Sequence, residues 1–225
     1  MLLLALDTAT DGVAVALHDG ERVLAAARAG DARHHNEVLV PTIAAVLAEA
    51  GRERGEVTDI AVGVGPGPFT GLRVGIVTAR TLGLAWGARV HGVCSLDALA
   101  AQAVAEGRVA PGEEFLVATD ARRREVHTAR YAAGDDGLRR LAGPDVGPAA
   151  AVERRGAVVV GRGGELYPDA LGPASPPADV DAAFLAAIAA DALAGRGGPG
   201  LLPVEPLYLR RPDATEPGAR KRVTA

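Results

Sequence analysis

Two aspartates end short apolar segments, and both could take part in binding a metal ion or a phosphate. Asp7 follows the apolar run 2–6, and the hydroxyls of Thr8 and Thr10 come directly after it. Asp120 ends a second run of the same kind. A carboxylate beside hydroxyl oxygens suits a hydrated Mg²⁺ and the phosphate that it neutralises. Either aspartate alone is more often a turn residue at a strand end. The interpretation as a binding site therefore depends on the pattern occurring twice.

Two such aspartates facing each other across a cleft are typical of the actin-like nucleotide-binding architecture. In an active site of that kind a glycine follows the second aspartate by two residues, whereas this chain has Arg122 there. A bulky cation at that point blocks the phosphate or replaces it. We therefore predict a vestigial nucleotide site. Its residues are Asp7, Thr8, Thr10, Asp120 and Arg122.

The segment 65–75 reads Gly-Pro-Gly-Pro-Phe-Thr-Gly-Leu-Arg-Val-Gly and resembles a phosphate loop only superficially. It has no Lys-Ser/Thr after its last glycine, and its prolines lack the N–H donors that a phosphate needs. Small residues then recur every fourth position and form one stripe along a helix: Gly71, Gly75, Ala79 and Gly83. Each glycine costs about 1 kcal/mol inside a helix, so the stripe predicts a second helix packed unusually close. That helix could be the segment 39–50 or could belong to another chain.

Other reactive residues give weaker signals. Adjacent His34 and His35 point about 100° apart on a helix, so with Glu37 they fit a metal poorly, and we predict no metal site. Cys94 is the sole cysteine and lies in an apolar run, which favours a small buried residue over a catalytic thiol. A glycine-rich segment at 161–164 is more typical of a strand-to-loop connection than of an adenosine site.

The elements that must position these residues follow from hydrophobic periodicity and turn signals. The first half predicts three antiparallel strands, then helices alternating with strands: strands 2–6, 13–17 and 22–26, a helix from 36–38 to 50, strand 59–64, helix 69–86, strand 89–93 and a helix from 95. The second half opens in the same way and then runs short: strands 115–120, 125–131 and 157–160, and helix 181–193. We predict two lobes, residues 1–106 and 107–225.

Composition limits the class of protein. A hydrophobic content of 48% with 23% charged residues is typical of a globular chain, so disorder is not expected. The formal net charge of −4 argues against a basic nucleic-acid platform. We find no signal peptide and no apolar stretch long enough to span a membrane, and so expect a cytoplasmic protein.

Together, the segments 7–10, 35–41 and 65–75 resemble the TsaB (YeaZ) family, an accessory subunit of the bacterial machinery that makes threonylcarbamoyladenosine in tRNA. Segments 94–99 and 206–210 also look like later landmarks of that family. The resemblance implies an α/β actin-like (ASKHA, ribonuclease H-like) fold with a reduced second lobe. It also implies a non-catalytic scaffold for the transferase TsaD, which carries the metal and modifies N6 of the adenosine beside the anticodon. Ser95 and Leu99 stand where TsaD has its metal-binding histidines.

The resemblance further implies that the two helices of the first lobe pack against their counterparts in TsaD, or in a second copy of this chain. The implied interface residues are His35, Glu37, Leu39, Pro41, Phe69, Thr70, Gly71, Leu72, Arg73, Gly75, Ala79 and Gly83. The ATPase TsaE would join the pair, tRNA would be reached only through the complex, and no membrane is involved. The chain would need no cofactor of its own, while ATP or ADP at the interface of the complex and a role of residues 122–124 in contacting tRNA stay open. The alternative is an actin-fold ATPase or kinase, or a peptidase-like enzyme, acting alone.

Overall fold

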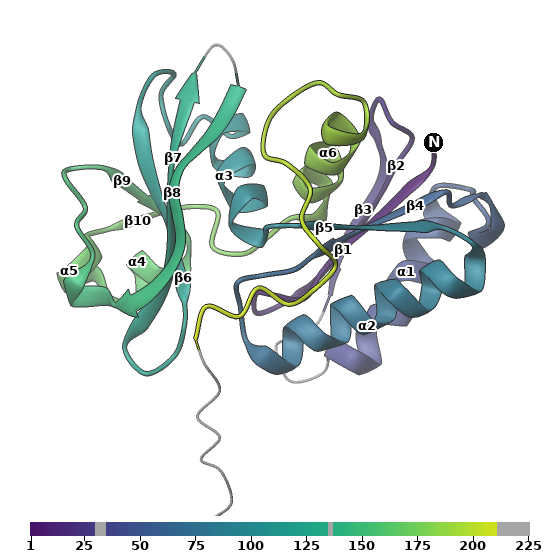
Figure 1. Cartoon of the computed structure of the whole chain (residues 1–225), viewed down its shortest axis with the longest axis horizontal. Coiled ribbons are helices and arrows are strands. Elements are labelled where there is room, and N and C mark those ends of the chain that lie inside the picture. Colours follow the sequence, from purple (N-terminus) through teal and green to yellow (C-terminus); the bar gives the residue numbers. More distant parts are fainter. Residues whose placement is uncertain (30–34, 135–136, 211–225) are drawn as a thin grey trace, which may run out of the picture.

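The fold is seen in a computed structural model, which describes residues 1–29, 35–134 and 137–210. Two five-stranded sheets, each flanked by helices, stand next to each other (Figure 1). The first sheet and its helices consist of β1 (Leu3–Asp7), β2 (Val13–His18), β3 (Val23–Ala29), α1 (His35–Glu49), β4 (Asp59–Gly63), α2 (Phe69–Trp86) and β5 (Arg89–Val93). The remaining elements are α3 (Ser95–Ala105), β6 (Glu114–Asp120), β7 (Glu125–Gly134), β8 (Gly137–Pro148), β9 (Val158–Val160), α4 (Arg162–Leu166), α5 (Pro168–Leu171), β10 (Ala174–Ser175) and α6 (Ala182–Leu193). Single 3₁₀ turns lie at Arg54–Glu56 and Ala149–Ala151.

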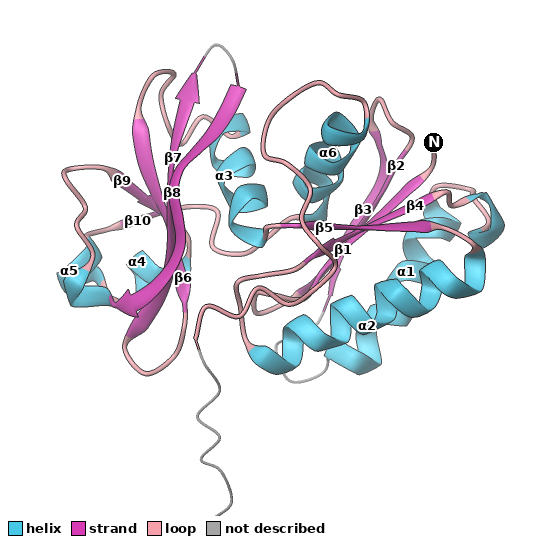
Figure 2. Ribbon diagram, in the orientation of Figure 1, coloured by secondary structure: helices cyan, strands magenta, loops and turns pink. Residues whose placement is uncertain are grey.

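The first sheet has the order β3-β2-β1-β4-β5. The predicted antiparallel opening of three strands is confirmed, and β4 and β5 run parallel to β1. Because side chains alternate along a strand, β1 presents Leu4 and Leu6 to α1 and α2 on one face and Leu3 and Ala5 to the opposite face. Both faces are covered by helices (Figure 2), so β1 is buried along its whole length.

The second sheet has the order β10-β9-β6-β7-β8. The pairing of β6 with β7 and with β9 agrees with the predicted strands. The edge strand β8 was not predicted from the sequence, because it has no fully buried residue and therefore shows no apolar alternation. The short helix α4 replaces the predicted loop at residues 161–164, and the two-residue strand β10 was not predicted.

The C-terminal part of the chain returns to the first sheet. Helix α6 packs on β1 and β2, and Leu202 forms an antiparallel bridge with Gly92 of β5. The boundary near residue 106 separates the two sheets, but assigning all of 107–225 to the second lobe is wrong. The alanine-rich face of the first sheet needs a cover, and the alanine-rich α6 supplies it.

Within the described ranges, none of the helices combines the length and apolar character that crossing a bilayer requires.

Candidate functional site

Asp7 is a buried structural anchor. Its side chain is fully buried, Oδ2 accepts a 2.6 Å hydrogen bond from the Ser95 hydroxyl, and Oδ1 accepts one of 2.7 Å from the Ala9 amide. A Cβ at Gly63 would lie 1.7 Å from Oδ2, so the neighbouring backbone is packed directly on the carboxylate. Burial raises the pKa of Asp7, which Ser95 and Ala9 offset only in part. The carboxylate joins the end of β1 to the start of α3 and is closed to a hydrated metal.

Thr8 is also buried, and its side chain binds the backbone of helix α2. Its hydroxyl donates to the carbonyl of Gly71 at 2.7 Å and accepts from the amide of Gly75 at 3.1 Å. The two backbone groups are four residues apart, so the hydroxyl lies against one turn of the helix. This contact is possible because Gly75 has no side chain: a Cβ there would lie 2.5 Å from Thr8 Oγ1.

The stripe of small residues therefore packs on the chain's own sheet. Gly75 lies over Thr8, Leu6 of β1 and Val62 of β4, while a Cβ at Gly83 would lie 2.4 Å from Val90 of β5. The prediction of a closely packed neighbour is confirmed at Gly75 and Gly83, but at these two positions the neighbour is the sheet and not the predicted helix. The helix lies this close to the sheet because its own side chains are absent at Gly75 and Gly83.

The residues of the predicted partner interface consequently divide into two groups. One group is buried within this chain and is not available to a partner: Leu39, Gly71, Leu72, Gly75, Ala79 and Gly83. The other is exposed: Glu37, Pro41, Phe69, Thr70 and Arg73. The side chain of His35 lies outside the described residues, as does the whole of His34.

Helices α1 and α2 expose an apolar surface whose large residues are not among those of the predicted interface. We call it the outer face, and its large apolar members are Val40 of α1 with Val77 and Leu84 of α2, which are 58%, 60% and 89% exposed. The two helices lie side by side on the same side of the first sheet (Figure 1). The signal was present in the sequence, since α2 has apolar residues seven positions apart opposite its glycine stripe.

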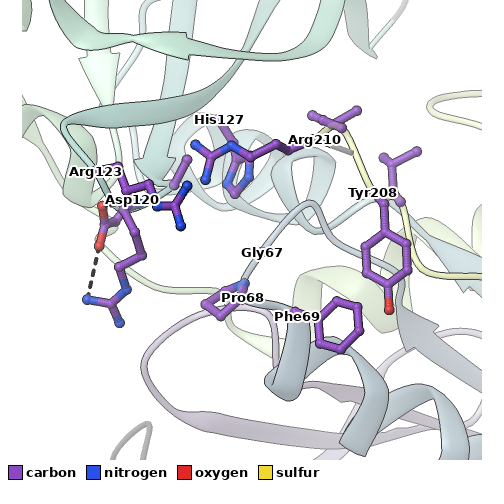
Figure 3. Close-up of a pocket in the computed structure, with 12 residues that line it drawn as sticks. Gly67, Pro68, Phe69, Asp120, Arg123, His127, Tyr208 and Arg210 are labelled. Carbon is purple, nitrogen blue, oxygen red and sulfur yellow. Dashed lines mark hydrogen bonds and ion pairs between the residues drawn. The ribbon is translucent and has the colours of Figure 1, made fainter. Parts of the chain in front are cut away.

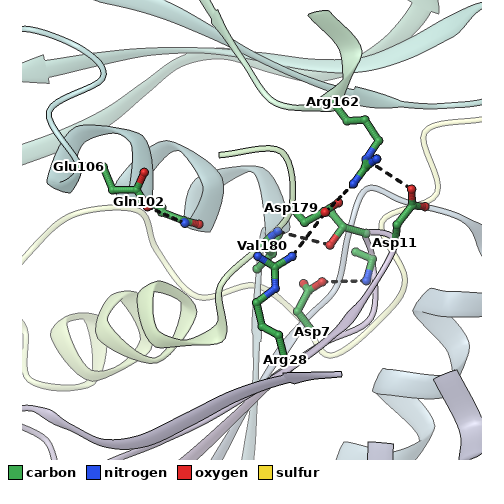
Figure 4. Close-up of polar contacts among 10 residues, drawn as sticks. Asp7, Asp11, Arg28, Gln102, Glu106, Arg162, Asp179 and Val180 are labelled. Atoms are coloured by element: carbon green, nitrogen blue, oxygen red, sulfur yellow. Dashed lines mark hydrogen bonds and ion pairs between the residues drawn. The ribbon is translucent and has the colours of Figure 1, made fainter. Parts of the chain in front are cut away.

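The cleft between the lobes is occupied by an ionic cluster (Figure 4). Arg162 of α4 lies 3.4 Å from Asp11 and 2.6 Å from Asp179, and Arg28 lies 3.4 Å from the same Asp179 carboxylate. Thr10 accepts a 3.3 Å hydrogen bond from the Val180 amide. These contacts join the β1–β2 hairpin to the second lobe, and Arg162 was not among the predicted residues.

The predicted vestigial nucleotide site is brought together only in part. Thr10, Asp120 and Arg122 line one small cavity together with Arg162, whereas Asp7 and Thr8 do not reach it. Arg122 lies 3.2 Å from the Asp120 carboxylate, so these two charges satisfy each other. The cavity has a volume of about 20 Å³, enough for about one water molecule. The strand-end cleft has no room for a nucleotide.

Cys94 and the α3 helix offer no reactive group. Burial raises the pKa of the Cys94 thiol to about 12, so the thiol stays protonated and is not a nucleophile at neutral pH. Asp97 accepts a 2.8 Å hydrogen bond from Tyr131 and lies 3.3 Å from Arg140, which connects α3 to the second sheet. Within the ranges that the structure describes, no cluster of His, Cys, Asp and Glu could hold a metal ion.

Comparison with known proteins supports the family that the sequence resembles. The family model described as "TsaD: tRNA N6-adenosine threonylcarbamoyltransferase" matches residues 29–161. A protein of Mycobacterium tuberculosis (strain ATCC 25618 / H37Rv) without an assigned function is 42% identical over 94% of this chain and 93% of its own. The Escherichia coli (strain K12) tRNA threonylcarbamoyladenosine biosynthesis protein TsaB is 34% identical over 61% of this chain and 58% of its own. The structure of YeaZ from Pseudomonas aeruginosa superposes with a TM-score of 0.79 at 31% identity, covering 92% of this chain and 99% of that one.

The two sheets, their flanking helices and this superposition define an α/β protein of the actin-like (ASKHA, ribonuclease H-like) fold, as the sequence predicted. Within that class, the chain belongs to the TsaB (YeaZ) family.

Proposed function

We propose that this chain acts in the biosynthesis of threonylcarbamoyladenosine in tRNA, as a non-catalytic subunit bound to a TsaD-type transferase. The relatives named TsaB support a role in this biosynthesis. The match to the TsaD model supports a partner built on the same fold. In this proposal the transferase modifies N6 of the adenosine beside the anticodon, a TsaE ATPase joins the pair, and tRNA is reached through the complex. Without TsaD, the chain pairs with a second copy of itself.

The outer face of α1 and α2 carries the docking part of the proposal. Leu84 is 89% exposed and Val77 60% exposed on the same helix, and Phe69 at its start is 47% exposed. Large apolar side chains gathered on one helical face indicate a protein interface more than single scattered ones do. Arg73 and Arg80 are exposed on the same helix and can form a polar rim around the apolar centre.

The filled cleft supports a non-catalytic role over an ATPase or kinase. The Asp7 carboxylate already accepts hydrogen bonds from Ser95 and Ala9, and Arg162 occupies the space between the lobes. The peptidase alternative would need an activated nucleophile, and the Cys94 thiol is buried and protonated. An enzyme acting alone would have to open both regions before any substrate entered.

The test is co-purification of the tagged full chain with TsaD from the same organism, followed by an assay of tRNA modification. We expect modification only with both proteins. We expect Leu84→Glu to weaken the complex by at least about tenfold, because a charge at the centre of an apolar interface must be desolvated.

Leu166→Glu is the matched control. Leu166 is 47% exposed, but it lies on α4 in the other lobe, far along the chain from the outer face. We expect this variant to bind TsaD like the wild type. Undiminished binding by folded Leu84→Glu would refute docking through the outer face, and ATP hydrolysis by the chain alone, abolished by Asp7→Ala, would favour the enzyme.

A further inference from the structure

The segment 201–210, which we call the strap, runs along the β5 edge of the first sheet (yellow in Figure 1). Its Leu202 exchanges two backbone hydrogen bonds with Gly92 of β5, at 2.8 and 3.2 Å. Only glycine permits this approach, because a Cβ there would lie 2.6 Å from a carbonyl oxygen of the strap. Further along, the amide of Leu207 donates to the carbonyl of Val64 at 2.8 Å. The strap is therefore fixed to the fold.

The strap holds two arginines of helix α2 in place. The Tyr208 hydroxyl accepts a 3.0 Å hydrogen bond from Arg73 Nε. The carbonyl of Val204 accepts one from Arg80 Nη2. Tyr208 also stacks on Phe69 with ring centroids 5.1 Å apart (Figure 3), and the Arg73 guanidinium lies 3.7 Å from the centre of the Phe69 ring. Both arginines are thus held in set positions although both are exposed.

The charges of these two arginines are not neutralised by the part of the chain that the structure describes. No carboxylate there forms an ion pair with Arg73 or Arg80, and the strap's own Glu205 is no exception. In contrast, Arg89 and Arg162 are each paired with an aspartate. Each hydrogen bond to the strap uses one of the five N–H groups of a guanidinium, so other donors remain. A fixed guanidinium of this kind suits a carboxylate from outside the chain.

The two arginines border the apolar outer face. They are seven residues apart, so they lie on the same side of α2 and about 10 Å apart along its axis. Val77 comes between them in the sequence, and Leu84 follows about one turn after Arg80. Charges at the border of an apolar patch contribute more to the choice and orientation of a partner than to the bulk of the affinity. Arg73 and Arg80 are therefore placed to determine which apolar surface can dock.

From these two fixed guanidinium groups without a counterion, we infer that Arg73 and Arg80 select a partner surface with two carboxylates about 10 Å apart. Two acidic side chains seven positions apart on one helix of the partner have this spacing. The strap is the positioning element, because arginines that are held before binding lose less conformational entropy on binding. The inference rests on the proposed docking of a TsaD-type partner through the outer face, and it adds the chemistry that this partner must present.

The experiment measures the dissociation constant of the full chain with TsaD from the same organism, at low and at high concentrations of NaCl. Arg73→Glu combined with Arg80→Glu should weaken binding by at least about tenfold at low salt, because two attractions become repulsions. High salt should reduce this loss, since it screens charges at a surface. Leu84→Ala removes an apolar contact and should weaken binding equally at both salt concentrations. Arg139→Glu is the control, because Arg139 is exposed on β8 of the other lobe, and it should bind like the wild type.

Tyr208→Phe tests the positioning role of the strap. It keeps the ring that stacks on Phe69 and removes the hydroxyl that holds Arg73. We expect binding to TsaD to weaken by about threefold, the cost of ordering one long side chain on binding. In a chain that also carries Arg73→Ala, Tyr208→Phe should have no further effect, because the side chain that it positions is gone.

The inference is overturned if the folded double arginine variant binds TsaD like the wild type, or if its loss is the same at low and high salt. Loss of self-association alone, measured by analytical ultracentrifugation, would identify a second copy as the occupant and would also overturn it. The positioning role of the strap is overturned if Tyr208→Phe weakens binding equally with and without Arg73. Weak binding by Leu84→Ala with normal binding by the arginine variant would leave docking through the outer face in place, so the two proposals fail separately.

Discussion

The two faces of helix α2 use neighbouring residues for opposite purposes. The inner face has glycine and alanine, so its backbone lies against the sheet and accepts the Thr8 hydroxyl. The outer face has Val77 and Leu84, which project into solvent. A side chain added to the inner face collides with the chain's own core, whereas a side chain changed on the outer face stays largely in solvent. The inner face therefore determines stability, and the outer face is where we propose that a partner docks.

Gly75→Leu should give the largest effect of the changes on this helix. Its Cβ would lie 2.5 Å from Thr8 Oγ1 and 3.5 Å from Leu6, so α2 must move off the sheet. We expect a loss of about 3 kcal/mol in the free energy of unfolding, at the upper end of overpacking costs. The measurement is chemical denaturation followed by circular dichroism.

If Gly75 instead faced a partner, as the predicted interface implies, Gly75→Leu would disrupt the complex and leave the fold largely intact. Thr81→Leu is the control, because Thr81 is exposed on the same helix. If Gly75→Leu were as stable as Thr81→Leu, the close contact between α2 and β1 would be wrong.

Thr8→Val should have the next largest effect. It keeps the shape of the side chain and removes the hydroxyl that joins the Gly71 carbonyl to the Gly75 amide. We expect a loss of about 2 kcal/mol, the cost of leaving buried polar groups without a partner. Thr8→Ser retains the hydroxyl and should recover part of that loss in the same denaturation experiment. If Thr8→Val were as stable as the wild type while Thr8→Ser lost stability, the methyl group, and not the hydroxyl, would stabilise this contact.

Leu84→Glu should have the smallest effect on the isolated chain. Leu84 is 89% exposed, so the free energy of unfolding should change by no more than about 0.5 kcal/mol. Its thermal midpoint should match that of the wild type at low protein concentration. A large loss of stability in the monomer would show that the outer face is part of the core after all, and the contrast between the two faces would disappear.

Local patterns predicted most of the elements correctly. The apolar runs that end at Asp7 and Asp120 are β1 and β6, and the four-residue spacing of small residues correctly indicated a close approach along α2. Such signals depend on near neighbours in the chain, so a sequence carries them by itself. The edge strand β8 and the short helix α4 lack that periodicity, and they were missed for this reason.

The sequence by itself determined that this chain folds as α/β lobes, that a helix with a bare stripe lies close to something, and that the first strand ends in a carboxylate. Only the tertiary structure decided which residues the stripe and the carboxylate contact. Ser95 reaches Asp7 across 88 positions, and Val180 reaches Thr10 across 170. The stripe meets a sheet because β1, β4 and β5 come together beneath α2. Pairings over such separations depend on how the sheets and helices assemble, and no local pattern specifies them.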